Sequence, residues 1–361
     1  MYQIAICTGS RAEWGLLEPI AYAIDTDPDL DLLLLVTGSH LSPAHGFTRN
    51  DIKLPVAECI ECVMSSDTPV GVTTGRALAE MRFADTFQRY RPDCCVVLGD
   101  RWEVLGAALA AWDAQIPVVH LHGGDVTKGS LDNGYRNAIS CLSSLHLTSN
   151  SGASYRLICN TFLNGATVRN VGALRDDMDA ITAEHTVPEY DFVCLFHPAL
   201  DAGITQLVTL LRALPRDQYG LFIHTNADAK GHIFNQTIDD FVSEVESWVV
   251  VDSLPRGTFL ASVKRAGYMI GNSSAGITEA VGLGTPSINI GTRQKGRQVP
   301  GSVVNVENLT EAGIRAAIER VNGDAFRGVL PHVYNPYSGG KTSEEIVGII
   351  KGWLRGCNST E

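Results

Sequence analysis

The chain has 361 residues, of which 45% are hydrophobic and 19% charged, as in ordinary folded globular proteins. Its length is greater than one typical core and predicts two domains. The net charge of −12 argues against a nucleic-acid binder, which normally has a basic face. No apolar run approaches the length of about 20 residues that spans a bilayer. Nine scattered cysteines and a start without a signal-peptide pattern suit a reducing cytoplasm, so we expect a cytoplasmic protein.

Short apolar runs alternate with amphipathic segments through the first half of the chain. The predicted elements are, in order, a strand at Tyr2–Cys7, a helix at Ala12–Ile24, a strand at Asp31–Val36, a helix at Thr74–Tyr90, a strand at Asp93–Leu98, a helix at Glu103–Trp112, a strand at Ile116–Leu121, a helix at Tyr135–Ser144 and a strand at Leu145–Thr148. The run from residue 31 to 36 is almost entirely apolar, which is typical of a strand buried on both faces of a parallel sheet. The alternation predicts a doubly wound α/β domain.

Polar sequence around Gly172–Tyr190 interrupts this pattern and marks the predicted domain boundary. The alternation then resumes with Phe192–Phe196, Thr205–Leu214, Leu221–His224, Ile238–Glu246, Trp248–Val251, Thr258–Arg265, Val303–Val306, Glu311–Val321 and a final helix at Ser343–Leu354. We therefore expect a second α/β domain. Two such domains, each binding ligands at the carboxyl ends of its strands, predict an active site in the cleft between them.

Polar residues gather where the strands of the first half end. Arg11 follows the first strand, Asp100 and Arg101 follow a later one, and Asp125 follows the next. The histidine His120 also lies near these strand ends. Taken singly, such residues have ordinary structural explanations, Asp100 as a helix cap and His120 as a core histidine whose hydrogen bonds are satisfied. Their accumulation at one edge of a sheet predicts a catalytic site.

The stretch Gly271–Arg297 combines a small-residue turn at 271–276, a predicted helix at 277–284, a strand at 286–290 and a basic turn at 291–297. Slim side chains at a helix start leave backbone amides for an anion. A carboxylate within the helix and basic residues beyond it would suit the ribose and diphosphate of a nucleotide. The alternative is an ordinary α/β turn with an Asn or Ser cap. The candidate residues here are Ser273, Ser274, Gly276, Glu279 and Arg297.

Two further strand ends carry candidates. His197 follows the strand 192–196 and precedes a proline that makes the turn rigid. A histidine in this place could transfer a proton or contact a diphosphate. Asp228 lies in the polar end of the strand 221–224. The chain has no G-x-S-x-G, no Walker A loop, no G-x-G-x-x-G after a strand and no metal-ligand spacing. We therefore expect neither a metal nor a cofactor.

Several motifs together resemble one family. TGSRAEWGLL, TGSHLS, LGDRWE, HLHGGDVTKGSLDN, FHP, NADAKG, GNSSAGITEA, NIGTRQKGR and the terminal NPYSGGKTSEEIV occur in the order found in UDP-N-acetylglucosamine 2-epimerases, over nearly the whole chain. The likeness is greatest to the hydrolysing branch, which makes precursors of sialic-acid-type sugars.

The resemblance implies a fold and a domain plan. The family has two Rossmann-like domains in a GT-B arrangement, with the last helix returning to the first domain. For this chain the expected domains are residues 1–172 completed by 341–361, and residues 173–340. A homodimer or homotetramer is also expected.

The resemblance further implies a reaction. The proton at C2 of the sugar is removed while the nucleoside diphosphate leaves C1, and water adds to the resulting 2-acetamidoglucal. From UDP-N-acetylglucosamine this gives UDP and free N-acetylmannosamine. By motif position, Asp100, Asp125, Asp132 and His197 match the catalytic residues. Arg11, Arg101, Ser273, Ser274 and Gly276 would hold the diphosphate and Glu279 the ribose, with Asp228 and Arg297 as additional candidates.

This sequence departs from the family in one loop. GGD stands where GGE is usual, so the carboxylate of Asp125 reaches about 1.5 Å less far. Asn133 and Asn137 replace a common acid and a common histidine. The shorter acid would leave room for a bulkier C4 substituent, as in UDP- or GDP-linked 2,4-diacetamido-2,4,6-trideoxy sugars. Two alternatives remain, a GT-B glycosyltransferase and a nucleotide-sugar binder without turnover.

Overall fold

The computed structural model describes residues 1–66, 68–160, 165–173, 182–199, 203–225, 230–338 and 340–357. By internal contacts the chain divides into two compact units. The first comprises Met1–Asp125, Asp132–Asp176 and Gly339–Glu361, and the second comprises Val126–Leu131 and Asp177–Ser338. In the described part of the chain, no helix is both long and apolar enough to cross a membrane.

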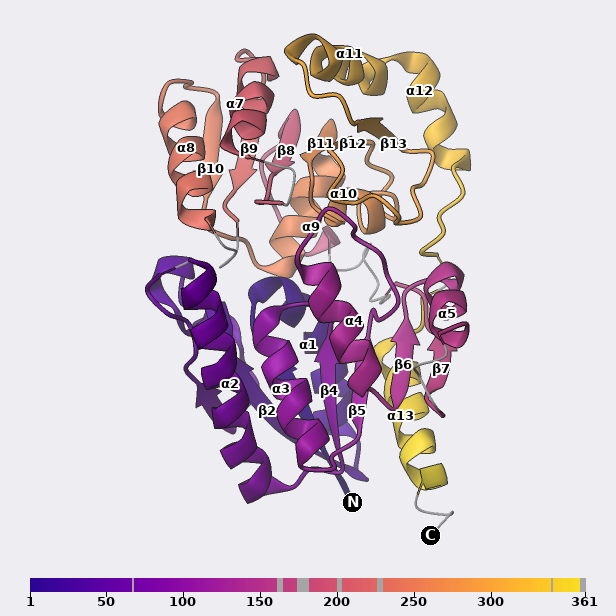
Figure 1. Cartoon of the computed structure of the whole chain (residues 1–361). Helices are drawn as coiled ribbons and strands as arrows, with labels where there is room; N and C mark the ends of the chain where they lie inside the picture. Colours follow the sequence, from indigo (N-terminus) through magenta and orange to yellow (C-terminus); the bar gives the residue numbers. More distant parts are fainter. Residues whose placement is uncertain are drawn as a thin grey trace. The chain divides into compact units, whose positions relative to one another are not determined.

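The first unit is built on a parallel sheet in which seven described strands follow the order β3-β2-β1-β4-β5-β6-β7 (Figure 1). Its strands are β1 (Tyr2–Thr8), β2 (Leu30–Thr37), β3 (Glu58–Ile60), β4 (Cys94–Leu98), β5 (Val118–Leu121), β6 (Leu145–Thr148) and β7 (Thr167–Asn170). Its helices are α1 (Arg11–Thr26), α2 (Pro69–Tyr90), α3 (Trp102–Asp113), α4 (Asp132–Leu142), α5 (Ser151–Ile158) and α13 (Ser343–Cys357), with short 3₁₀ turns η1 (Gly38–Leu41), η2 (Pro43–His45) and η3 (Thr48–Asp51).

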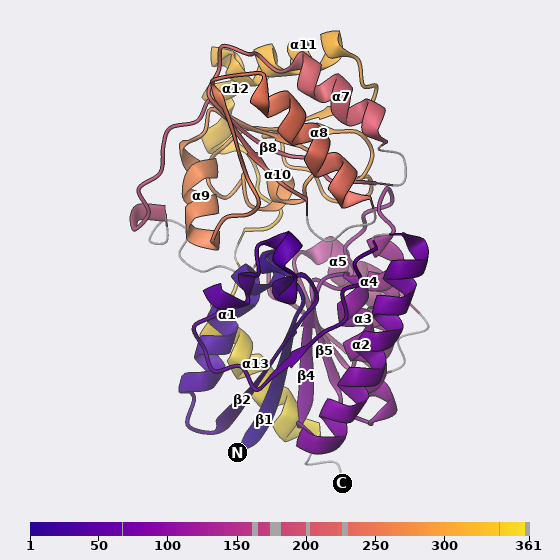
Figure 2. The same ribbon diagram turned by 90° about the vertical axis from the view of Figure 1, so that its left-hand side faces the viewer.

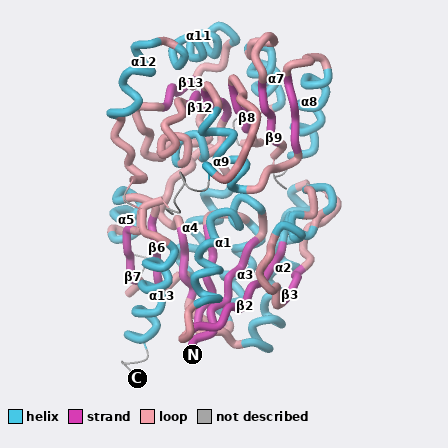
Figure 3. Tube along the Cα trace, turned by 180° about the vertical axis from the view of Figure 1, so that it is seen from behind, coloured by secondary structure: helices cyan, strands magenta, loops and turns pink. Residues whose placement is uncertain are grey.

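Both faces of this sheet are buried, which explains the apolar strands. Alternate residues of β1 point to opposite faces: Ile4 and Ile6 pack with α1 and α13, whereas Ala5 and Cys7 pack with α2 and α3. Helices α2, α3 and α4 cover the face turned to the viewer in Figure 1. Seen from behind, α1 and α13 cover the other (Figure 3).

Helix α13, although last in the sequence, belongs to the first unit and lies beside α1 (Figure 2). Its Ile346 and Ile350 are fully buried in the core beneath α1. At the rim, the Lys351 ammonium bonds Asp27 at 2.7 Å and Asp29 at 2.7 Å. The apolar seam and these ion pairs hold the helix on the sheet.

The second unit has a parallel sheet of six described strands in the order β10-β9-β8-β11-β12-β13. The strands are β8 (Phe192–Leu195), β9 (Gly220–Ile223), β10 (Trp248–Val251), β11 (Tyr268–Gly271), β12 (Ser287–Ile290) and β13 (Val303–Val306). The helices are α7 (Ile204–Ala213), α8 (Gly231–Ser243), α9 (Arg256–Arg265), α10 (Ala275–Thr278), α11 (Glu311–Asn322) and α12 (Asp324–Val329), followed by η4 (Leu330–His332). Helices α7 and α8 lie on one side of this sheet and α9 on the other (Figure 2). The prediction of two doubly wound parallel α/β domains is confirmed.

The helix expected at 277–284 is the main difference from the predicted elements. The structure has only the four-residue α10, followed by turns. Helix α10 already ends at Thr278, and Gly282 and Gly284, the latter with φ +74°, disfavour a continuation of helix beyond it. Strands β3 and β7 and helices α5 and α12 are additional to the elements predicted from the sequence.

A short loop of the first half, Val126–Leu131, packs within the second unit. The Lys128 amide donates to the carbonyl of Lys295 at 3.1 Å. Gly129 lies against the main chain of the basic turn, where a Cβ would come within 2.5 Å of the Arg293 Cα. Gly296 has φ +96°, and a Cβ there would lie 2.6 Å from Val126 Cγ1. Two glycines therefore make this contact possible.

Replacing Gly129 by alanine tests the contact. The added methyl group meets backbone atoms, so we expect G129A to lower the free energy of unfolding by about 1–3 kcal/mol. Gly134, five residues on in α4, has open space around its Cβ position and serves as the matched control. G134A should instead be more stable by about 0.5–1 kcal/mol. Urea unfolding measures both, and equal effects of the two variants would contradict the tight contact.

Candidate functional site

Both sheets reverse their strand order at one point, where parallel α/β sheets bind ligands at the carboxyl ends of the strands. In the first unit the reversal lies between β1 and β4, which are followed by Arg11 and by Asp100 with Arg101. In the second unit it lies between β8 and β11, which are followed by His197 and by the turn containing Ser273. Arg11, Asp100 and Arg101 thus lie at one switch point and His197 and Ser273 at the other, whereas the predicted residues Asp125 and Asp132 follow β5.

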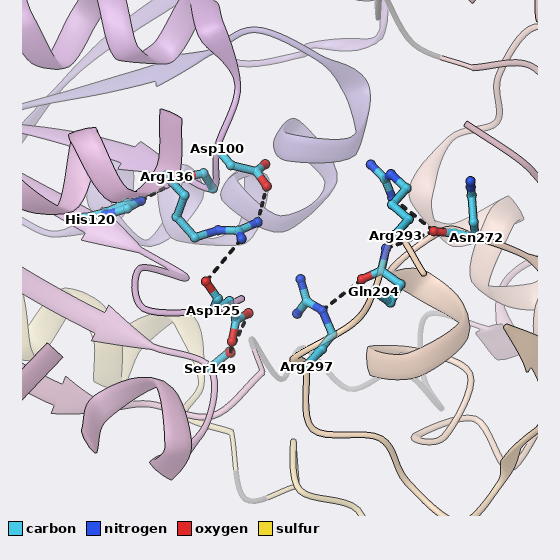
Figure 4. A network of polar contacts seen from close by, with 10 residues as sticks. Asp100, His120, Asp125, Arg136, Ser149, Asn272, Arg293, Gln294 and Arg297 are labelled. Carbon is cyan, nitrogen blue, oxygen red and sulfur yellow. Dashed lines mark hydrogen bonds and ion pairs between the residues drawn. The ribbon is translucent and has the colours of Figure 1, made fainter. Parts of the chain in front are cut away.

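Asp100 is paired with an arginine that the sequence analysis did not single out. Arg136 of α4 donates from Nη2 to Asp100 Oδ2 and from Nη1 to the main-chain carbonyl of Asp125 at 3.3 Å (Figure 4). The Arg136 side chain is 5% exposed and that of Asp100 is 24% exposed. A buried guanidinium therefore pairs with one oxygen of Asp100, whose side chain remains partly exposed.

His120 fixes the turn that carries Asp100. Its Nε2 lies 2.8 Å from the Gly99 carbonyl oxygen, which only accepts, so Nε2 carries the proton. Nδ1 then accepts from the Ser140 hydroxyl at 3.1 Å. Burial lowers the pKa of His120 to about 3, so the ring is neutral. The interpretation of His120 as a satisfied core histidine is confirmed, and its bonds join β5 to the β4 turn and to α4.

Asp125 is drawn into the protein by two neutral donors. The Ser149 hydroxyl lies 3.1 Å and 3.0 Å from its two carboxylate oxygens, and Asn150 Nδ2 lies 2.9 Å from Oδ1. Both donors follow β6, and Asn150 also caps α5 by accepting from the Ala153 amide. Asp125 is only 3% exposed. Its carboxylate is thus held back against the end of β6.

Asp132 is the first residue of α4, one helical turn before Arg136. Residues four apart share a helix face, and a carboxylate at a helix start is favoured by the helix dipole. The segment that links Asp132 to Asp125 is the loop packed in the second unit. Asn133 and Asn137, the two loop departures, lie in the first turns of the same helix.

The two predicted arginines of the first unit are both paired with acids. Arg11 begins α1 and bonds Asp51 of η3 at 2.7 Å. Arg101 caps α3 and donates from Nε to Glu103 at 2.8 Å. Glu103 is fully buried.

A second buried acid, Glu13, lies in the first turn of α1 and accepts from the Gly9 amide at 2.7 Å. Burial, reinforced by the nearby charge of Glu103, raises its pKa to about 8. Glu13 is therefore protonated at neutral pH. It stabilises the turn after β1 in a form that carries no charge.

His197 is clamped at its main chain by Asn272, the residue after β11. The His197 amide donates to Asn272 Oδ1 at 2.7 Å, and Asn272 Nδ2 donates to the His197 carbonyl at 2.8 Å. Asn272 is fully buried. The two residues follow neighbouring strands, β8 and β11, so this pair joins the two strand ends at the switch point.

The basic turn is tied to the same asparagine. Arg293 Nη1 and Gln294 Nε2 donate to the Asn272 carbonyl at 3.1 Å and 2.9 Å, and Arg297 Nε donates to Gln294 Oε1 at 3.1 Å (Figure 4). This chain of bonds sets the guanidinium of Arg297 relative to the turn after β11.

The small-residue turn and Glu279 lie in and beside α10. Ser273 and Ser274 directly precede the helix, Gly276 lies within it, and Glu279 ends it. Glu279 accepts from Arg256 of α9 at 3.0 Å through Oε1. Asp228 lies outside the described residues.

The residues of these networks that are absent from the sequence-based candidates include Arg136, Ser149, Asn150, Asn272 and Arg256. A detectable signal existed for three of them, because Ser149, Asn150 and Asn272 directly follow strands as the predicted residues do. Arg136 and Arg256 lie on helices, where a charged residue is ordinarily solvated, so their partners emerge only in three dimensions.

Two doubly wound parallel α/β units, with polar residues at the carboxyl ends of their strands, have the architecture of the GT-B class of proteins. The family model for UDP-N-acetylglucosamine 2-epimerase matches residues 22–351. The chain belongs to this family, as its motifs indicated.

Two relatives and one solved structure are similar to this chain over most of its length. A GDP/UDP-N,N'-diacetylbacillosamine 2-epimerase (hydrolyzing) from Campylobacter jejuni is 32% identical over 84% of this chain and 84% of its own. A UDP-N,N'-diacetylbacillosamine 2-epimerase (hydrolyzing) from Legionella pneumophila is 30% identical over 97% of this chain and 95% of its own. Among solved structures, the UDP-GlcNAc 2-epimerase from Neisseria meningitidis bound to UDP-GlcNAc has a TM-score of 0.79 at 16% identity, covering 98% of this chain and 100% of that one. That likeness shows the fold.

The protonated Glu13 generates a pH prediction. The folded chain keeps a proton that an unfolded glutamic acid releases above its ordinary pKa of 4.5, so stability falls as pH rises from about 4.5 to 8. Glutamine has the same size and cannot ionise. We expect E13Q to weaken this fall, so that the variant gains stability relative to the wild type as pH approaches 8. Urea unfolding across this range, with the exposed Glu61 changed to glutamine as control, measures it. Parallel pH curves for E13Q and wild type would refute a buried, protonated Glu13.

Proposed function

We propose that this protein is a hydrolysing 2-epimerase of a nucleotide-linked 2,4-diacetamido-2,4,6-trideoxy sugar. The reaction consumes the sugar nucleotide and one water, and it releases the nucleoside diphosphate and the free 2-epimer. The proton at C2 and the diphosphate at C1 leave to give a glycal with a C1–C2 double bond. Water then adds its oxygen to C1 and a proton returns to C2 from the opposite face.

The arrangement of the first unit suits the proton transfers. Asp100, paired with Arg136 through Oδ2 and partly exposed, is the candidate base. Asp125 and Asp132 supply further carboxyl groups for the returning proton and the water. Asp132 lies on α4 together with Arg136, the arginine that holds Asp100. The positions of both acids therefore depend on this helix.

The second unit suits the leaving group. The amides and small side chains of Ser273, Ser274 and Gly276, with Arg297, would neutralise the departing diphosphate, and His197 would support it. Glu279 would accept the ribose hydroxyls through Oε2 while Arg256 holds Oε1. Arg11, Arg101 and Asp228 would complete the diphosphate contacts. This assignment of roles, and the action of both units on one substrate molecule, are parts of the proposal.

The observation that carries the choice of sugar is the retracted Asp125. A short acid drawn back by Ser149 and Asn150 leaves more space in front of it than a projecting glutamate would. An acetamido group at C4 needs such space, whereas the hydroxyl of N-acetylglucosamine does not. Diacetylbacillosamine is a sugar of this 4-acetamido kind, and the two relatives named for it support the same choice over UDP-N-acetylglucosamine.

Incubation with candidate sugar nucleotides in deuterated water, followed by proton NMR, tests the reaction. We expect UDP- or GDP-N,N'-diacetylbacillosamine to yield the free 2-epimer, deuterated at C2, together with the free diphosphate. UDP-N-acetylglucosamine should react more slowly. Faster turnover of UDP-N-acetylglucosamine would overturn the choice of sugar. An epimer still attached to its nucleotide, or transfer of the sugar to an acceptor, would overturn the reaction itself.

Lengthening the retracted acid tests the basis of specificity. In D125E the carboxylate projects about 1.5 Å further, into the space assigned to the C4 acetamido group. We expect the ratio of kcat/KM for the 4-acetamido sugar to that for UDP-N-acetylglucosamine to fall about tenfold, since misplacement on this scale is costly. The exposed Asp113 at the end of α3 provides the control D113E. An unchanged ratio in D125E would argue against Asp125 as a determinant of the sugar.

A further inference from the structure

Asn272 uses all of its polar groups within the second unit. Its main-chain amide donates to the Leu195 carbonyl at 3.0 Å, and its main-chain carbonyl accepts from Arg293 and Gln294. Its side chain makes the two bonds to the His197 main chain. A fully buried amide bonded in this way has a single orientation, because exchanging its oxygen and nitrogen would set two donors and two acceptors against each other.

The residue before it explains why the strands can approach so closely. Gly271 has φ +141°, and a Cβ at this position would lie 1.8 Å from the Leu195 carbonyl oxygen. Strand β11 therefore ends in direct main-chain contact with the end of β8. This contact brings the Asn272 side chain alongside His197.

We propose that Asn272 is a positioning residue for catalysis, which sets the place and direction of His197 through its side chain. The inference rests on the proposed function for the role of His197 in the reaction. The side chain of Asn272 bonds the main chain of His197, whereas its main-chain carbonyl accepts from Arg293 and Gln294 of the basic turn.

This separation makes the proposal testable, because a substitution removes only the side-chain bonds. In N272A the basic turn keeps its two bonds to the main-chain carbonyl, whereas the His197 main chain loses both partners. We expect kcat to fall about 100-fold, the cost of a misplacement of about 1 Å. Affinity for the nucleoside diphosphate, measured by calorimetry with UDP and GDP, should change less than threefold.

The variant N272D separates positioning from simple stabilisation. A carboxylate still accepts from the His197 amide but repels the His197 carbonyl, whereas a protonated carboxyl group reproduces both bonds of the amide. We expect kcat of N272D to recover as pH falls, relative to the wild type at the same pH. Arg293 beside this position favours the carboxylate, whereas full burial favours the protonated form, so kcat is followed from about pH 9 downward to include the recovery.

A second buried asparagine supplies the matched control. Asn289 on β12 is buried, and its Nδ2 donates to Asn305 Oδ1 at 2.8 Å on the neighbouring strand. N289D should lower the melting temperature without a low-pH recovery of kcat. Equal pH profiles for N272D and N289D, or a wild-type kcat in N272A, would overturn the proposal.

A measurement on the ligand-free protein keeps this inference distinct from the proposed function. The imidazole carbon and proton signals of His197, assigned by their loss in H197A, report its surroundings by NMR without any turnover. In N272D these signals should move toward their wild-type positions as pH falls. If they do so in a protein inactive on every sugar tested, the proposed function fails and the positioning of His197 by Asn272 stands. Signals at wild-type positions at all pH values would refute the positioning.

Discussion

A buried parallel strand leaves main-chain donors and acceptors at its carboxyl end that the sheet does not pair, and they need partners inside the protein. Three of the polar residues near the two switch points meet this need. His120 bonds the carbonyl of Gly99, Glu13 accepts from the amide of Gly9, and Asn272 serves both main-chain groups of His197. The same edge is where a ligand meets the sheet, so groups that shape the turns and groups that face a substrate are neighbours by necessity.

This constraint separates the two kinds of residue. Glu13 and His120 are buried and neutral at physiological pH, since burial disfavours their charged forms. Asp100 is partly exposed, although a buried arginine pairs with one of its oxygens. Asp125 is intermediate, with its carboxylate bonded by hydroxyl and amide donors that carry no charge. The strand ends of the first unit thus carry buried neutral groups as well as the partly exposed Asp100.

The doubly wound units are predictable from the sequence because buried strands appear as short apolar runs and the helices between them as amphipathic segments. It also located the strand ends, and with them Asp100, His197 and Arg297. It did not indicate Arg136 or Arg256, because a helical arginine has the same local pattern whether it faces water or a buried carboxylate. The predicted helix at 277–284 is longer than α10, since the apolar spacing from Ile277 onward resembles a helix although the chain continues in turns after Thr278.

The loop Val126–Leu131 has a consequence for how the molecule is divided. The second unit is assembled from two stretches of chain, and the smaller one is covalently continuous at both ends with the first unit. A gene fragment that begins at Asp177 would therefore encode a unit in which Gly296 and the main chain of Arg293 lack the segment that packs against them. The two halves of this protein are physical modules, but they are not modules that recombination could exchange in one piece.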